Sequence, residues 1–390
     1  MAELQTAVIV DAVRTAGGKR NGVLREWHPV DLAAEVLGAI QERNDIDPAV
    51  IDDVITGCVM QVGEQAVNVA RNAVLAAGWP DSVPGTTVDR QCGSSQQALH
   101  FAAQGVMAGV YDVVVASGVE VMTRVPMGAS IVDGKYGMPF GPRVGARYEP
   151  AGGLVPQGIS AELIAEKWGL SREDLDAFGA RSQALALQAT EQGRFEREII
   201  PVVGAEGQPV TRDEGIRPGT TPETLANLKP SFMENGKVTA GNSSQITDGA
   251  SACLITSERR AAELGLTPRA RIHAFALAAA DPRLMLTAPI PATEKVLANG
   301  GLTLDDIDLV EINEAFASVV LAWEKEHHPD MDRVNVNGGA IALGHPLGCS
   351  GTKLMATLLN ELERSGGRWG LQTMCEGGGM ANATIIERLG

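Results

Sequence analysis

The feature that most constrains the fold is a plan that occurs twice along the chain. Residues 86–118 read as a strand, a glycine-rich turn, a helix and a second strand, and residues 333–378 repeat that order. In each helix the apolar residues recur at a spacing of three or four, which places them on one face. They are Ala98, Leu99, Ala102, Ala103 and Val106 in the first copy, and Leu354, Met355, Leu358, Leu359 and Leu362 in the second. The sequence therefore predicts two similar α/β halves.

Short β-branched runs also alternate with helical patterns near the N-terminus. The runs predict strands at 7–10, 53–56 and 85–89, and the patterns predict helices at 29–42 and 68–77. Such alternation is typical of an α/β fold with a largely parallel sheet.

The segment between the two halves has a different composition. From about residue 122 to residue 245 it is rich in Gly, Pro and Met at first, and it later carries a helical pattern opened by Ser171, with Asp174 three residues on. Near Thr239 a loop leads into an apolar strand. We therefore divide the chain into an N-terminal half at 1–120, an inserted loop domain at 121–246, a completion of the N-terminal half at 247–269 and a C-terminal half at 270–390.

Composition and charge exclude several classes of protein. The 390 residues carry 32 Lys and Arg against 48 Asp and Glu, a formal net charge of −16, which disfavours a nucleic-acid surface. Five scattered cysteines build neither a disulfide framework nor a Cys-x-x-Cys zinc site, so we expect no metal. No run approaches the roughly 18 apolar residues of a membrane span, and the start does not resemble a signal peptide. We expect a cytoplasmic protein without membrane insertion.

Three residues in glycine-rich turns can do chemistry. Cys92 follows a predicted strand and precedes a helix, where backbone N–H groups and the helix dipole favour a thiolate and a depressed pKa. Cys375 ends a predicted strand, and His345 stands in a rigid turn that opens a helix. Singly, a free cysteine is usually a core residue and a lone histidine is more often structural. Functional turns gather at the carboxyl ends of strands in α/β sheets, so we expect the three to meet there if the halves pair.

Asn313 lies at another boundary between a strand and a helix. It follows a predicted strand at 308–312 and precedes a helical pattern that begins near Phe316. Its ordinary role there is a helix N-cap, with Glu314 as a favourable acid in the first turn. A role in the site is the alternative.

With these motifs in this order, the whole chain resembles the thiolase family. The motifs are VDRQCGSSQQA around Cys92, TAGNSSQITDGA, INEAFA, NVNGGAIALGHPLGCSG around His345 and MCEGGG around Cys375. One such motif alone is a weak signal, whereas several in order are a strong one. The resemblance implies a five-layered fold of two similar α/β halves with an inserted loop domain, assembled as a homodimer or homotetramer.

The resemblance also implies a role for each site residue. Cys92 would accept the acyl group as nucleophile, His345 would activate it, and Cys375 would move the proton on the carbon that becomes the acetyl methyl. Asn313 would hold a water that forms, with His345, an oxyanion hole for the enolate. The backbone N–H groups of Cys92 and Gly377 would form a second hole for the tetrahedral intermediate, and such donors act where negative charge develops.

Four further positions match contacts with coenzyme A. Arg217 and Ser244 match residues that contact coenzyme A, and Ala315 and Phe316 match the wall along its pantetheine arm. Coenzyme A would then be a substrate, and no permanently bound cofactor is implied.

The activity so implied is reversible CoA-dependent thiolysis of a 3-ketoacyl-CoA to acetyl-CoA and a shortened acyl-CoA, as in β-oxidation. A thiolate suits this reaction because it is both a good nucleophile and a good leaving group. Biosynthetic acetoacetyl-CoA thiolases carry a histidine in the loop that matches 122–157, where this chain has none, so the degradative reaction is favoured over the biosynthetic one. Two alternatives stay open: a decarboxylating condensing enzyme, which Cys375 disfavours, and a non-catalytic subunit that binds CoA thioesters.

The chain departs from the family pattern in two places. Ser95, Gln96 and Gln97 stand where smaller or apolar residues are usual, so we expect an altered acyl tunnel, beside a pocket shaped by the loop at 122–158. Glu376 directly follows Cys375, and a carboxylate pointing inward would raise the pKa of that thiol. We therefore expect Glu376 to point away from the site.

Overall fold

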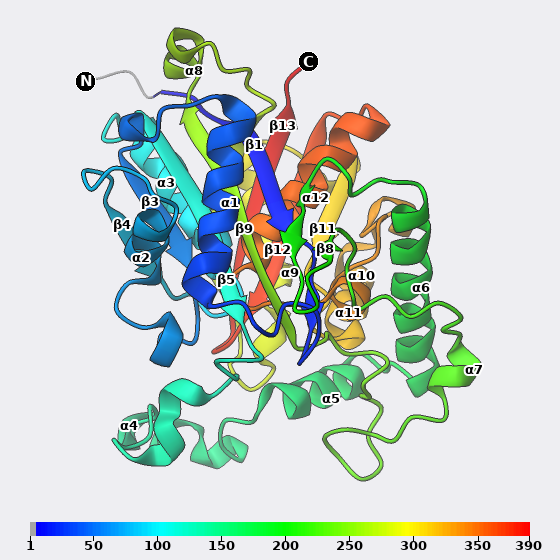
Figure 1. Cartoon of the computed structure of the whole chain (residues 1–390). Helices are drawn as coiled ribbons and strands as arrows, with labels where there is room; N and C mark the ends of the chain where they lie inside the picture. Colours follow the sequence, from blue (N-terminus) through cyan, green and yellow to red (C-terminus); the bar gives the residue numbers. More distant parts are fainter. Residues whose placement is uncertain (1–4) are drawn as a thin grey trace.

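Several central strands are buried along their whole length, because helices cover both faces of the sheet. A computed structural model describes residues 5–390 (Figure 1). Its main sheet has 11 strands. In spatial order the path is β11 (Leu309–Ile312), β12 (Trp369–Glu376), β13 (Met380–Arg388), β10 (Ala270–Ala279), β1 (Ala7–Thr15), β9 (Thr247–Ser257), β5 (Val113–Val121), β3 (Asp53–Gly57) and β4 (Gly85–Val88). The short strands β2 (Gly18–Lys19) and β6 (Ile199–Ile200) pair with β9 and β1.

The strand order confirms the predicted duplication. The first half runs β3-β5-β9-β1 and the second runs β11-β12-β13-β10, so each parallel pair is followed by two antiparallel neighbours. The two sets join where β1 pairs with β10. The expectation of a largely parallel sheet was wrong, because β9 and β13 each return antiparallel between two neighbours.

The strand predicted at the start of the second copy does not form. The first copy has β4 at this place, but residues 333–337 make only isolated bridges, one of them between Val310 and Val334. Asn335 adopts a left-handed φ of 48°, and its side chain both accepts from the N–H of Ile312 and donates to its C=O, each at 2.9 Å. A side-chain amide thus takes the place of a strand ladder.

Helices form three layers around the two sets of strands (Figure 1). The outer layer of the first half contains α1 (Pro29–Asn44) and α2 (Val69–Ala76), the central layer contains α3 (Ser94–Met107) and α12 (Ser350–Ser365), and the outer layer of the second half contains α9 (Pro289–Gly300) and α10 (Ala317–His327). Three hydrophobic clusters match these layers, and the central one packs both α3 and α12 against strands of both halves. The predicted five-layered architecture and the early helices are confirmed.

The segment between β5 and β9 wraps around the lower end and one side of the body (Figure 1). It contains α4 (Pro142–Tyr148), α5 (Gln157–Lys167), α6 (Arg172–Glu191), α7 (Pro222–Leu225) and a hairpin of β7 (Val202–Val203) with β8 (Pro209–Val210). The predicted cap of α6 is present, because Ser171 and Asp174 form a reciprocal capping box.

The remaining elements are short. They are α8 (Glu258–Leu264), α11 (Ala340–Leu343) and the 3₁₀ turns η1 (Pro48–Val50), η2 (Gly63–Gln65), η3 (Ala129–Gly134), η4 (Glu149–Ala151), η5 (Met285–Thr287), η6 (Leu304–Asp306) and η7 (Met331–Arg333). Among residues 5–390 there is no helix with both the length and the apolar character needed to cross a membrane.

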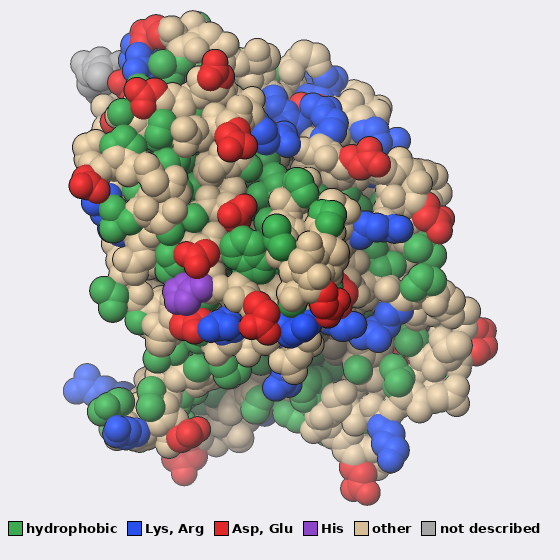
Figure 2. Space-filling view, in the orientation of Figure 1, with side chains coloured by type: hydrophobic (Ala, Val, Ile, Leu, Met, Phe, Trp, Pro, Cys, Tyr) green, Lys and Arg blue, Asp and Glu red, His purple; other side chains and the backbone are tan. Residues whose placement is uncertain are grey.

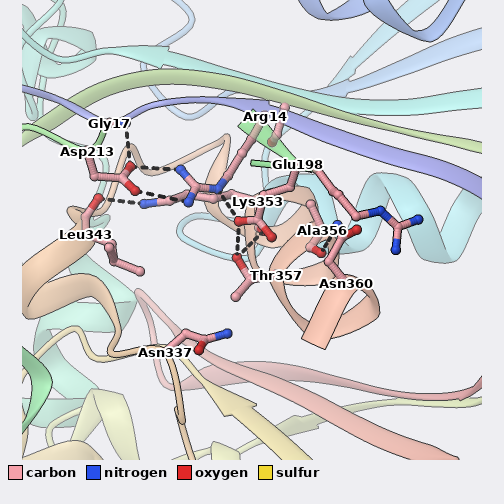
Figure 3. Close-up of polar contacts among 12 residues, drawn as sticks. Arg14, Gly17, Glu198, Asp213, Asn337, Leu343, Lys353, Ala356, Thr357 and Asn360 are labelled. Atoms are coloured by element: carbon pink, nitrogen blue, oxygen red, sulfur yellow. Dashed lines mark hydrogen bonds and ion pairs between the residues drawn. The ribbon is translucent and has the colours of Figure 1, made fainter. Parts of the chain in front are cut away.

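A buried ion cluster ties the inserted segment to both halves (Figure 3). Arg14 of β1 donates to both oxygens of Asp213, at 2.8 and 3.0 Å, and to Glu198 at 2.6 Å. Glu198 also accepts from Thr357 of α12 at 2.8 Å. Burial opposes the charge of Asp213, but Arg14 and then Lys353 hold its pKa below the ordinary value. The positive charges of Arg14 and Lys353 are therefore compensated only while both Asp213 and Glu198 are present.

We expect Asp213→Ala to destabilise the protein by about 3 to 5 kcal/mol, because it leaves buried cations without their counter-charge. Urea unfolding would measure this loss. Glu64→Ala is the matched control, since Glu64 pairs with Arg124 at the surface and such pairs contribute about 1 kcal/mol or less. Equal losses in the two variants would contradict the role of the cluster.

Candidate active site

The first turns of α3 and α12 lie against each other, and the turn before α12 lies against β5, because glycine is present at both contacts. A Cβ on Gly351 would lie 2.0 Å from the backbone N of Gln96, and one on Gly118 would lie 2.4 Å from the carbonyl oxygen of Gly348. Real side chains do not approach so closely, so only glycine permits this packing. It brings the turn of Cys92 next to the turn of His345.

Cys92 lies in an apolar pocket at the start of α3. It is 8% exposed and belongs to a small hydrophobic cluster with Val59, Met60, Met122, Val125, Leu347 and Met374. Burial, and then the charge of Glu376, raise the pKa of the Cys92 thiol to about 12, although the N–H groups of Cys92 and Gly377 act in the opposite direction. The expected depressed pKa is therefore wrong, because loss of water outweighs the effect of the helix terminus.

Cys375 faces the same site from the end of β12. It is fully buried, and burial and then the charges of Cys92 and Glu376 raise the pKa of its thiol well above the ordinary value. Because one sulfur alters the ionisation of the other, the two share one electrostatic environment. The structure thus brings Cys92, Cys375 and the N–H of Gly377 together.

His345 is held in one tautomer by its neighbours. Its Nδ1 lies 2.5 Å from the hydroxyl of Ser350, and that hydroxyl donates its own hydrogen to the carbonyl of Pro346 at 2.8 Å. Ser350 must therefore accept from Nδ1–H, which leaves Nε2 as a base. Burial, and then the charge of Lys353, lower the pKa of His345 to about 3, so the imidazole is neutral.

Asn313 lies beside His345 and does not cap a helix. Its Nδ2 is 3.4 Å from Nε2 of His345, while its Oδ1 is buried and accepts no hydrogen bond from residues 5–390. The N-cap expectation was wrong because α10 begins only at Ala317. Glu314 is likewise no first-turn acid: it accepts from Ser182 and Asn335 at 2.6 and 3.0 Å.

His345 stands in the predicted turn before a helix, but the expectation that this turn follows a strand was wrong. It lies in the turn between α11 and α12 and not at the end of a strand, because the strand expected before it does not form. Lys353 stabilises this turn: its ammonium donates to the carbonyls of Leu343 and Gly344, at 2.7 and 2.8 Å (Figure 3). The side chain that fixes the turn thus also adds a charge that, after burial, lowers the pKa of His345.

Glu120 ties the site together from β5. Its carboxylate accepts from the N–H groups of Val59 and Met60 in the pocket wall, at 2.9 and 3.1 Å, and from Gly348 in the His345 turn at 2.9 Å. Glu120, Lys353 and Ser350 were not predicted from the sequence as site residues. Glu120 and Lys353 could have been found, because each is a charged residue within a stretch whose apolar pattern predicts burial.

Of the four residues matched to coenzyme A, three adjoin one another. The N–H of Ser244 donates to the carbonyl of Ala315 at 2.9 Å, and the neighbouring Ser243 bridges Phe316. The ring of Phe316 packs edge-on against Phe232, with centroids 5.9 Å apart. These residues form a partly apolar wall.

Arg217 reaches the same region along a different loop. It is exposed, and its N–H donates to Gln183 of α6 at 2.8 Å. Two residues earlier, the carbonyl of Gly215 accepts from Gln245, the neighbour of Ser244, at 2.8 Å. In the space-filling view a recess with hydrophobic side chains separates the inserted segment from the body (Figure 2).

The two departures from the family pattern do not lie where we expected. Gln96 donates to the carbonyl of Gln372 and to Thr384, and Ser95 accepts from the N–H of Thr352, so both face the second half and not the acyl pocket. Glu376 is fully buried with its carboxyl group against Gly93, so it does not point away into solvent, and its charge raises the pKa of both thiols. The start of α3 covers it, as described below.

The start of the inserted segment adjoins the Cys92 pocket. The sulfur of Met60 accepts from the N–H of Gly128 at 3.2 Å and from Ser130 at 3.7 Å, and Met122 and Val125 belong to the pocket cluster. Among residues 5–390, no group of three or more His, Cys, Asp or Glu side chains is arranged to hold a metal ion. The chemistry available is that of two thiols, a neutral imidazole and backbone N–H donors.

Comparison with known proteins agrees with this arrangement. The family model described as "Thiolase, N-terminal domain" matches residues 7–259, and "Thiolase, C-terminal domain" matches residues 266–388. A steroid 3-ketoacyl-CoA thiolase of Mycobacterium tuberculosis is 53% identical, over 100% of this chain and 95% of its own length. A 3-ketoacyl-CoA thiolase of Saccharophagus degradans is 48% identical, over 98% of each chain.

A solved structure is similar over the whole chain. The crystal structure of an acetyl-CoA acetyltransferase of Bacillus anthracis superposes with a TM-score of 0.91 at 40% identity, over 100% of both chains. Two family models that together span nearly the whole sequence, and relatives that align from end to end, establish the family. The chain belongs to the thiolase family.

Proposed function

We propose that the chain is a 3-ketoacyl-CoA thiolase that cleaves its substrate with coenzyme A to acetyl-CoA and a shortened acyl-CoA. The observation that carries this proposal is the pair of buried thiols, Cys92 and Cys375, whose ionisations are coupled. One thiol is needed to accept the acyl group and the other to protonate the enolate that leaves. The names of two relatives, both 3-ketoacyl-CoA thiolases, support the same reaction.

In the first half of the proposed reaction, Cys92 transfers its proton to Nε2 of His345 and attacks the 3-keto carbon. The N–H groups of Cys92 and Gly377 bind the oxyanion of the tetrahedral intermediate. The bond between C2 and C3 then breaks, and the enolate of acetyl-CoA is bound by His345 and a water on Asn313. Cys375 protonates its carbon, a role favoured by a pKa that keeps this thiol protonated.

In the second half, coenzyme A gives its proton to the thiolate of Cys375 and attacks the acyl group on Cys92. The released Cys92 thiolate takes back the proton held by His345, so both thiols return to their starting state. Coenzyme A acts as a substrate throughout, and no permanently bound cofactor takes part. Ser244, Ala315, Phe316 and Arg217 bind it in this proposal.

We also propose a homo-oligomer in the cytoplasm. The inserted segment exposes Tyr136, Met138 and Phe140 at 81%, 64% and 62%, and large exposed apolar groups are typical of interaction surfaces. All five cysteines are free and buried, as suits a reducing compartment. Light scattering in solution would determine whether the protein is a dimer or a tetramer.

A biosynthetic acetoacetyl-CoA thiolase is the second candidate, because the similar solved structure is an acetyl-CoA acetyltransferase. Thiolysis of short, long and ring-bearing 3-ketoacyl-CoA substrates distinguishes the two. With Met60 and Met122 beside Cys92, flexible thioethers favour bulky acyl groups, so we expect a higher kcat/KM for the longer or ring-bearing substrates. Activity confined to acetoacetyl-CoA would favour the biosynthetic alternative.

We expect Cys92→Ser to lose CoA-dependent thiolysis by about 10³-fold or more, because a hydroxyl is a much weaker nucleophile than a thiol. Steady-state cleavage of a 3-ketoacyl-CoA would measure the loss. Cys253→Ala is the control, since Cys253 is buried in β9 within a different hydrophobic cluster. Full turnover by Cys92→Ser would refute the proposed role, and turnover of wild type at no chain length would favour a non-catalytic subunit.

The pH dependence of kcat/KM tests the state of His345. Because the pKa of His345 is lowered to about 3, the imidazole stays an unprotonated base down to about pH 4, and it would be lost only on further acidification. We therefore expect thiolysis to show no acid limb between about pH 5 and 7. The contrary result is a fall in kcat/KM on acidification with a midpoint near the ordinary histidine pKa of about 6.5. If that fall disappears in His345→Asn, the imidazole is not held neutral.

A further inference from the structure

Glu376 is a buried acid that the proposed mechanism does not use. It ends β12 directly after Cys375, and its exposed fraction is 0%. Its Oε1 lies against Gly93 at the start of α3, because a Cβ on that glycine would be only 2.1 Å from this oxygen. Asn382 lies on the same spot and donates to the carbonyl of Gly93 at 3.0 Å. The carboxyl group therefore lies beneath the turn that carries Cys92.

This carboxyl group has no hydrogen-bond partner. Neither oxygen of Glu376 accepts from any residue in the described range 5–390. Arg90 is the nearby cation, yet it forms no ion pair with Glu376 and one of its nitrogens contacts the sulfur of Met380 at 3.9 Å. A buried carboxylate without partners is strongly unfavourable, so the side chain is stable there only as a neutral acid.

The surrounding charges agree with this state. Burial raises the pKa of Glu376 to about 8, with Arg90 lowering it and Asp89 raising it again. From the turn before α3 the groups that face it are Asp89, Arg90 and Cys92, and from its own strand Cys375. The charge of Glu120 on β5 also raises the pKa of the Cys92 thiol, and it does so less than Glu376.

We propose that Glu376 acts through Cys92 as an electrostatic control: as a neutral acid it permits the Cys92 thiolate to form, and as a carboxylate it opposes it. Glu376 touches no reacting atom in this role and is a positioning residue. The inference rests on the proposed function only in taking Cys92 as the nucleophile. The effect on thiolate formation holds whether or not the chain turns over a substrate.

The direction of the effect on Cys92 follows from the order in which Glu376 and Cys92 lose their protons. Below about pH 8 the site contains a protonated Glu376 and only Cys92 needs to carry charge. Above it, each new Cys92 thiolate meets a carboxylate on the far side of Gly93, and like charges at this range disfavour one another. The protein therefore gains thiolate with rising pH less steeply than a single free thiol does.

The test is the rate at which iodoacetamide alkylates Cys92 between about pH 6 and 10, with the label located by peptide mass spectrometry. Glu376→Gln removes the ionisable group and keeps the shape. We expect it to react at about the wild-type rate at pH 6 and about tenfold faster at pH 9, the ratio for one pKa unit. Glu311→Gln is the matched control, since Glu311 is another buried acid, on β11, that is not among the charges acting on either thiol.

A second variant keeps the test decisive if Glu376→Gln does not fold. Glu376→Met fills the same space without a polar atom, and because the carboxyl group makes no hydrogen bonds in the described chain, we expect it to fold and to match Glu376→Gln. Profiles for both variants that coincide with wild type would overturn the inference, as would slower alkylation at pH 9. Loss of thiolysis in Cys92→Ser bears on the proposed function alone, whereas these profiles bear on Glu376 alone.

The pH dependence of stability provides a readout independent of the thiol. With a folded-state pKa of about 8 against about 4.3 in the unfolded chain, the protein loses stability as pH rises from about 4.3 to about 8, and the loss is complete above that pH. The free energy of unfolding of Glu376→Gln relative to wild type should therefore increase from about pH 5 to pH 9. A constant difference would show that Glu376 is already ionised in the native protein.

Discussion

The site depends on two close backbone contacts, one between the first turns of α3 and α12 and one between β5 and the turn before α12. Glycines at 118 and 351 let backbone meet backbone, so that two segments some 250 residues apart in sequence each present a reactive residue to one small volume. Lys353 and Glu120 then fix the His345 turn through its own carbonyl and N–H groups. The positions of Cys92 and His345 therefore depend on close packing and buried hydrogen bonds between segments, because neither residue is positioned by its own strand or helix alone.

Exclusion of water favours the neutral form of Cys92, His345 and Glu376. The same burial raises the pKa of Cys92 to about 12, lowers that of His345 to about 3 and raises that of Glu376 to about 8. Each group is therefore held in its neutral form near pH 7, and a charge appears only when a proton is handed to a neighbour. A dry, neutral resting site is what a reaction through transient thiolates and an enolate requires, since fixed donors then act at full strength on the charge that develops.

Much of this could be predicted from sequence, and the failures have physical causes. Helical periodicity and glycine-rich turns gave the duplicated halves, and the order of motifs selected Cys92, His345 and Cys375. A strand was wrongly predicted at 333–337, because the side chain of Asn335 replaces a strand ladder there, which no pattern of hydrophobicity reports. Asn313 was read as a cap, but three residues separate it from the start of α10 at Ala317. The position of Glu376 was not predicted, because the sequence does not reveal that Gly93 leaves room for a carboxyl group against it.

The most direct test of the central claim is to trap the acyl group. Mixing the protein with one equivalent of a 3-ketoacyl-CoA in the absence of free coenzyme A, followed by peptide mass spectrometry, locates the acyl chain. If a buried Cys92 is the nucleophile and a protonated Cys375 completes the cleavage, the shortened acyl group will be found on Cys92 with one acetyl-CoA released per chain. Acylation of Cys375 or of another residue, or release of acetyl-CoA with no acylated Cys92, would contradict the account.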